Sequence, residues 1–180
     1  QHFTGTTAIL GAEYYVPHLP HAPMEPPVAV ANVADGRCEV WASTQNPQAA
    51  RKEAARALGM AEKDVSVHVT FLGGGFGRKS KADFVSEAVL LARAAGAPVR
   101  VQWTREDDTH AGYFRPLYYH ALRAGLDAQG NIIGWQHRIV GQSILAGTPF
   151  ESMMVKDGVD ATSVEGASNL PYEIPAMLVD

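Results

Sequence analysis

The sequence has a single cysteine, no excess of basic residues and no long apolar run, and each of these absences excludes a class of protein. One thiol, that of Cys38, can form neither an internal disulfide nor an iron–sulfur cluster or a cysteine-based zinc site. Lysine and arginine together number 15 against 19 acidic residues, so the net charge of −4 provides no basic field for a nucleic-acid backbone. No apolar stretch approaches the roughly 20 residues that a membrane-spanning helix requires. We therefore expect a globular chain without a membrane span and without a nucleic-acid partner.

Hydrophobic residues make up 46% of the 180, which is enough to build a sizeable core. Alternating or β-branched runs predict strands at residues 12–16, 28–33, 38–42, 65–71, 99–103, 118–127, 131–140 and 176–179. The Asp35-Gly36 pair predicts a tight hairpin between the second and third of these runs. A slightly longer loop joins residues 118–127 to 131–140 as a second hairpin.

Two main helices are predicted. The first begins with Asn46 as its N-cap and Pro47 in its first turn, and it ends at Gly59. The second covers residues 83–95, and we expect its buried stripe to consist of Phe84, Ala88, Leu91 and Ala95. Strand pairs that alternate with single helices indicate an α+β fold with mixed sheets and hairpins.

Several polar residues receive structural interpretations. Glu25 lies in a proline-rich segment, residues 17–27, where a carboxylate could face a pocket, although we interpret it as a solvated loop residue. His18 and His21 lack the further ligands that a zinc site needs. The acids at residues 106–108 are typical of the first turn of a helix and are less suited to acid–base catalysis.

Residues 73–77, with the sequence Gly-Gly-Gly-Phe-Gly, are the most informative segment of the chain. Glycine costs roughly 0.5–1 kcal/mol in regular structure, so such a run indicates a close backbone approach or a positive φ. An unliganded turn is one interpretation. A P-loop is another, because Gly73 to Ser80 matches its pattern except for Arg78 where glycine is required. Phe76 favours neither, since an apolar ring has no role in holding phosphate and suits a flat or bulky cofactor.

Together with a Ser-Thr-Gln sequence at residues 43–45, this loop resembles the large subunit of the molybdenum hydroxylases, the xanthine dehydrogenase and aldehyde oxidase superfamily. The resemblance is greatest to the isoquinoline 1-oxidoreductase β-subunit branch. It extends through nearly the whole chain, and the segments that carry it are residues 43–47, 73–79, 101–108, 114–116, 122–134 and 140–143.

The resemblance implies a cofactor site. Gln45 occupies the position of a family glutamine that lies near the apical oxo group of molybdenum, where a neutral amide can donate a hydrogen bond without adding charge. Gly74, Gly75, Phe76 and Gly77 match the family loop that passes beside the molybdenum–pterin centre. The family's catalytic glutamate lies far downstream, so we expect neither a catalytic residue nor a direct metal ligand in this chain.

The resemblance also implies the chain's partners. We expect molybdopterin, in a dinucleotide form, to be bound by a full-length parent of which residues 1–180 are a single fragment of the cofactor-binding region. Such a parent hydroxylates N-heteroaromatic compounds or aldehydes with water-derived oxygen, and a small iron–sulfur subunit with [2Fe–2S] clusters removes the electrons. The fragment alone is expected to be inactive and could be empty of cofactor. Ser80 replaces the glutamate of purine-oxidising members, which makes a purine substrate doubtful.

Three questions stay open at this level. A P-loop-like nucleotide-binding domain and a non-catalytic scaffold domain remain as alternative functions. The sequence also does not decide between the bacterial cytoplasm and the periplasm.

Overall fold

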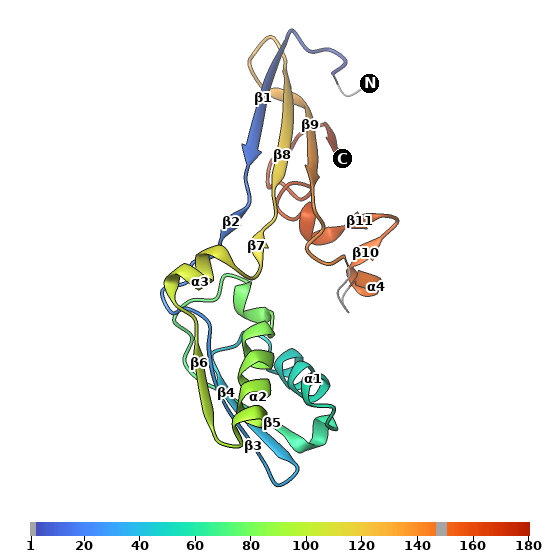
Figure 1. Cartoon of the computed structure of the whole chain (residues 1–180). Coiled ribbons are helices and arrows are strands. Elements are labelled where there is room, and N and C mark those ends of the chain that lie inside the picture. The colour runs from blue at the N-terminus through green and yellow to red at the C-terminus, as the bar shows by residue number, and fades with distance from the viewer. Residues whose placement is uncertain (1–2, 147–150) are drawn as a thin grey trace. The chain divides into compact units, whose positions relative to one another are not determined.

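The computed structural model describes residues 3–146 and 151–180, and the chain divides into two compact units. Pro20–Arg115 form the first, which we call the helical unit; Gln1–Leu19 and Pro116–Asp180 form the second, which we call the sheet unit (Figure 1). Both contain mixed sheets, as the predicted α+β class requires. None of the helices in the described ranges has the length and apolar character needed to cross a membrane.

The helical unit is built on a four-stranded sheet in the order β5-β4-β3-β6. Its strands are β3 (Val28–Ala34), β4 (Arg37–Ala42), β5 (Val65–Val69) and β6 (Val99–Gln102). The β3–β4 hairpin turns at Asp35 and Gly36, whose φ values of 49° and 73° are those of a mirror-image tight turn. The predicted hairpin is therefore confirmed. β5 lies parallel to β4, an arrangement that requires the crossover helix between them.

That crossover is α1 (Pro47–Leu58), and it packs beside α2 (Asp83–Ala95) on the sheet (Figure 1). Asn46 caps α1 by accepting a hydrogen bond from the Ala49 amide, and Gly59 ends it in the left-handed region. Both predicted caps are confirmed. The core between helices and sheet is formed by Ala29, Ala31, Cys38, Val40, Ala42, Ala50, Ala54, Ala55, Leu58, Val65, Phe84, Val85, Ala88, Val89 and Ala92.

The predicted buried stripe of α2 was wrong in its second half. Leu91 is 51% exposed and Ala95 is also exposed, whereas Val85, Val89 and Ala92 face the core beside Phe84 and Ala88. The buried stripe is two residues wide, because it follows the 3.6-residue period from both Phe84 and Val85. The prediction followed the period from Phe84 alone. Cys38 is buried as expected, and burial, with the nearby Glu39 carboxylate, raises the pKa of its thiol to about 11.

Shorter elements complete the helical unit. The 3-10 turns η1 (Glu62–Asp64) and η2 (Arg78–Ser80) precede β5 and α2, and α3 (Arg105–His110) follows β6. Thr104 and Asp107 form a reciprocal capping box at the start of α3, so its acids do belong to a helix N-terminus. β2 (Leu19–Pro20), which begins with the Leu19 residue of the sheet unit, pairs with β7 (Phe114–Arg115) in a two-stranded ladder.

The sheet unit contains a four-stranded sheet in the order β1-β8-β9-β12. The predicted hairpin is present as β8 (Tyr118–Leu126) and β9 (Ile132–Gly141), and β1 (Ala8–Val16) pairs antiparallel with β8. β12 (Ala176–Val179) lies parallel to β9. The smaller elements of this unit are α4 (Glu151–Met154), β10 (Val155–Lys156), β11 (Val159–Asp160) and η3 (Ala161–Ser163).

Candidate functional site

The glycine loop, which we define as residues 73–77, connects β5 to η2 and has an unusual backbone. Gly74, Phe76 and Gly77 have φ values of 95°, 52° and 89°, all in the region that L side chains rarely adopt. For a phenylalanine this conformation costs of order 1 kcal/mol, so surrounding contacts must hold it in place. Phe76 is nevertheless 72% exposed, which leaves it available to a ligand.

Gln45 lies against the centre of this loop. A Cβ atom added to Gly75 would be 2.5 Å from both Cδ and Oε1 of Gln45, so a larger residue there would have to displace the Gln45 side chain. The side-chain oxygen Oε1 of Gln45 accepts a hydrogen bond of 3.0 Å from the Gly77 backbone amide. The backbone amide of Gln45 donates to the Lys79 carbonyl at 3.0 Å. Because Oε1 is engaged, the other end of the Gln45 side chain, Nε2, is presented as a donor.

The backbone amides of Gly74, Gly75 and Phe76 have no hydrogen-bond partner within residues 3–146 and 151–180. Together with Gln45 Nε2 they form a concentration of unused donors at the loop. The structure thus brings together all five residues that the sequence nominated, namely Gln45, Gly74, Gly75, Phe76 and Gly77. Their contacts with a ligand stay a prediction.

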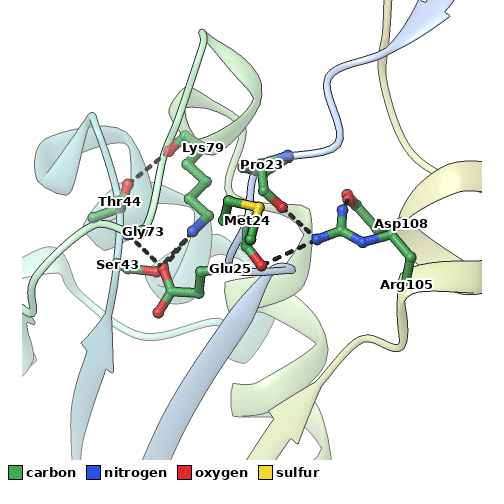
Figure 2. A network of polar contacts seen from close by, with 9 residues as sticks. All are labelled: Pro23, Met24, Glu25, Ser43, Thr44, Gly73, Lys79, Arg105 and Asp108. Atoms are coloured by element: carbon green, nitrogen blue, oxygen red, sulfur yellow. Dashed lines mark hydrogen bonds and ion pairs between the residues drawn. The ribbon is translucent and has the colours of Figure 1, made fainter.

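A polar network around the buried Lys79 side chain reaches the loop at Gly73 (Figure 2). The Lys79 side chain is fully buried, and its ammonium contacts Glu25 Oε2 at 2.5 Å and Ser43 Oγ at 3.3 Å. Glu25 Oε2 also accepts a hydrogen bond of 3.1 Å from the Gly73 amide. Burial raises the pKa of Glu25, but hydrogen bonds from Lys79, Gly73 and Ser43 together lower it by more. The pKa of this carboxyl is therefore below its usual value.

Glu25 is therefore not the solvated loop residue that the sequence suggested. The prediction failed because the partners of Glu25 are 48 and 54 residues away, where no local pattern reveals them. One signal was present: a carboxylate in a rigid segment rich in proline has few nearby amides of its own to bind.

The same network argues against a P-loop. A P-loop lysine must reach the phosphates from beside the loop, whereas the Lys79 ammonium is buried against a carboxylate. Arg78 is also buried: its guanidinium forms two hydrogen bonds with Asp83, at 2.7 and 2.8 Å, and lies 5.2 Å from the Trp103 ring centroid. Neither cation of this segment is available to a nucleotide.

The other nominated polar residues do not form a site. Within the described residues there is no cluster of three or more potential metal-binding side chains, and burial lowers the pKa of His21. Sequence analysis did not single out the contact between His120 and His137, whose Nδ1 and Nε2 atoms are 2.9 Å apart in the sheet unit. Diagonal positions on paired strands could have suggested it.

Comparison with known proteins identifies the family. Residues 1–180 match the family described as the molybdopterin cofactor-binding domain, and the chain belongs to it. Its relatives include the β-subunit of isoquinoline 1-oxidoreductase from Brevundimonas diminuta, 37% identical over 127 residues, which are 69% of this chain and 16% of the relative. One of the subunits of nicotinate dehydrogenase from Pseudomonas putida is 32% identical over 126 residues, 70% of this chain and 11% of that one.

Among solved structures, the aldehyde oxidoreductase of Desulfovibrio gigas superposes with a TM-score of 0.76 at 19% identity. The match covers 98% of this chain and 19% of the other, and it confirms the fold. The chain thus spans less than a fifth of the length of each of these three relatives. The predicted family and fold class are confirmed.

The residues present fit a molybdenum–pterin group. Such a group carries oxygen and nitrogen atoms that accept hydrogen bonds, and the glycine loop offers three unused amides beside Gln45 Nε2. Glycine at position 75 lets the Gln45 side chain pack directly against the loop backbone, which places its amide group beside the loop. The Glu25 carboxylate does not occupy these donors, because it accepts hydrogen bonds from Lys79 and from the Gly73 amide instead.

Proposed function

We propose that this chain forms part of the cofactor-binding region in the molybdenum subunit of an oxidoreductase. Family membership over the whole chain supports this, and the single observation that carries it is the set of unused donors around Gln45 and the glycine loop. A plain turn would not need three positive φ values and a buried glycine packed against an amide side chain.

In this proposal each site residue has a distinct task. Gln45 donates a hydrogen bond from Nε2, and the Gly77 amide fixes its orientation by binding Oε1. The amides of Gly74, Gly75 and Phe76 bind acceptor atoms of the cofactor, and the exposed Phe76 ring provides an apolar contact. When bound, the molybdenum–pterin group supplies the redox chemistry that transfers a water-derived oxygen to the substrate.

The substrate class that we propose is an N-heteroaromatic compound or an aldehyde. Relatives named isoquinoline 1-oxidoreductase and nicotinate dehydrogenase favour the first, and an aldehyde oxidoreductase with the same fold keeps the second open. We also propose a dinucleotide form of the cofactor and a small partner subunit with [2Fe–2S] clusters. One cysteine cannot hold such a cluster, so in this proposal the electrons leave through another polypeptide or region.

The test is to purify the enzyme that carries this chain and to measure its molybdenum by elemental analysis, together with any nucleotide that acid releases from it. We expect about one molybdenum per subunit in the wild type and a loss of roughly 10-fold or more in Gln45→Ala, the range found for residues that orient metal sites. Gln48→Ala is the matched control, because the Gln48 side chain lies on α1 and donates to Glu62, away from the loop. A wild type without molybdenum would favour the scaffold function instead.

A further inference from the structure

Glu25 holds the first residue of the glycine loop through two hydrogen bonds. The Glu25 amide donates to the Gly73 carbonyl at 3.0 Å, and the Gly73 amide donates to Glu25 Oε2 at 3.1 Å. A Cβ atom on Gly73 would lie 2.5 Å from the Glu25 Cβ, so the two backbones are in close contact. The start of the loop is therefore fixed to a segment 48 residues earlier in the chain.

Lys79 holds the other end. Its carbonyl accepts hydrogen bonds of 3.0 Å from the Gln45 amide and from Thr44 Oγ1, so it ties the end of the loop to the residues that carry the Gln45 side chain. Its ammonium reaches back to the Glu25 carboxylate. One ion pair thus joins both ends of the loop beneath it.

The segment that carries Glu25 is held from its other side by α3. The Arg105 guanidinium donates to the carbonyls of Pro23 and Met24, at 2.5 and 3.1 Å, and pairs with the buried carboxylate of Asp108 at 2.7 Å (Figure 2). These contacts fix the backbone immediately before Glu25. The carboxylate is consequently presented to the loop by a restrained segment.

We propose that Glu25 and Lys79 are positioning residues for cofactor binding: their ion pair closes the base of the glycine loop and so sets the direction of the Gly74, Gly75 and Phe76 amides. This inference rests on the proposed function, because it assigns these amides to the cofactor. In this proposal neither residue is assigned a contact with the cofactor itself. Their effect passes through Gly73 at one end and through the Gln45 backbone at the other.

The ion pair provides a way to separate positioning from simple stability. Glu25→Gln leaves the fully buried Lys79 ammonium without its counter-charge, which destabilises the whole unit. Lys79→Met leaves a carboxylate that is 32% exposed, so it should destabilise the unit less. Removal of both, as in Glu25→Gln with Lys79→Met, leaves no buried charge, so most of the stability should return. The link between the loop ends stays broken in that double variant.

The experiment compares four forms of the holoenzyme: wild type, Glu25→Gln, Lys79→Met and the double variant. Molybdenum content, the thermal unfolding midpoint and hydrogen exchange at the Gly77 amide are measured in each. The Gly77 amide is the decisive site because it donates to Gln45 Oε1 and forms no hydrogen bond with either substituted side chain. Glu53→Gln is the matched control, since it removes an exposed ion pair with Arg56 on α1.

We expect the double variant to regain most of the unfolding midpoint but to keep a molybdenum content roughly 10-fold or more below the wild type. Its Gly77 amide should exchange at least about 10-fold faster than in the control, since a broken hydrogen bond worth about 1.4 kcal/mol changes the equilibrium tenfold. If the double variant matches the control in both measurements, the pair is merely structural and the inference is wrong. If one single variant fails to fold, the double variant still decides.

Failure of the proposed function gives a different result. In that case the wild type itself lacks molybdenum, while the exchange rate at Gly77 still reports whether the ion pair controls the loop. A wild type that holds molybdenum and a double variant that holds as much would overturn only the positioning role.

Discussion

The two units of this chain support their sheets in different ways. In the helical unit α1 and α2 cover the sheet, and a continuous apolar core is buried between these helices and the sheet. In the sheet unit, β1 is exposed along almost its whole length, with Ile9, Leu10, Tyr14 and Tyr15 all exposed. All five nominated site residues and the Glu25–Lys79 pair belong to the helical unit. A loop with three positive φ values needs a rigid support, and the covered sheet supplies it.

Core truncation should reveal this difference most strongly. Phe84→Ala removes a ring that is fully buried between α2 and the sheet, and we expect the free energy of unfolding to fall by about 3–5 kcal/mol. Ile9→Ala removes an exposed side chain of β1 and should cost less than about 1 kcal/mol. Urea denaturation of both variants measures the difference. Equal losses would show that the helical unit is not the better packed of the two.

A methyl group added to the glycine loop tests the site itself. Gly75→Ala places Cβ against Gln45, and we expect a cost of about 1–3 kcal/mol as well as a displaced Gln45 side chain and less bound molybdenum. Gly11→Ala on β1 is the matched control, because its Cβ would meet only the Leu122 carbonyl oxygen, at 3.8 Å. Unfolding midpoints and molybdenum content are the two measurements. A Gly75→Ala protein with unchanged molybdenum would contradict the placement of the site.

Acid titration should give the smallest of these effects, and it distinguishes the units by their carboxylates. In the sheet unit, burial raises the pKa of Asp160, but hydrogen bonds from Ser143, Thr162 and the Leu145 amide lower it by more, so that the pKa is about 2. Because the pKa of Asp160 is lower in the folded than in the unfolded protein, its ionised carboxylate stabilises the folded state at neutral pH. This contribution is lost as the pH falls from about 4 through 2. Glu25 in the helical unit has the same sign.

The corresponding variants are Asp160→Asn and Glu25→Gln. Each should flatten the acid limb of the stability curve relative to wild type, as measured by unfolding midpoints across this pH range. A curve that keeps its full slope in Asp160→Asn would mean that other carboxylates cause the acid loss.

Sequence alone predicted the parts of the fold that depend on local chemistry. Asn46 with Gly59, and Asp35 with Gly36, specify a helix and a turn because their effects act within a few residues. The run of glycines drew attention to residues 73–77 without help, whereas Gln45 was nominated only because a family motif fixes its spacing from that loop. Glu25 and Lys79 show the limit: their pairing depends on how segments 54 residues apart come together, which no local pattern contains.

The central claim is that the donors around Gln45 and the glycine loop bind the molybdenum cofactor. An anomalous difference map of the holoenzyme at the molybdenum absorption edge tests it most directly. The account predicts one strong peak within reach of Gln45 Nε2, with pterin density along the amides of Gly74, Gly75 and Phe76. A molybdenum peak remote from this loop, with Gln45 and the three amides facing solvent, would contradict it.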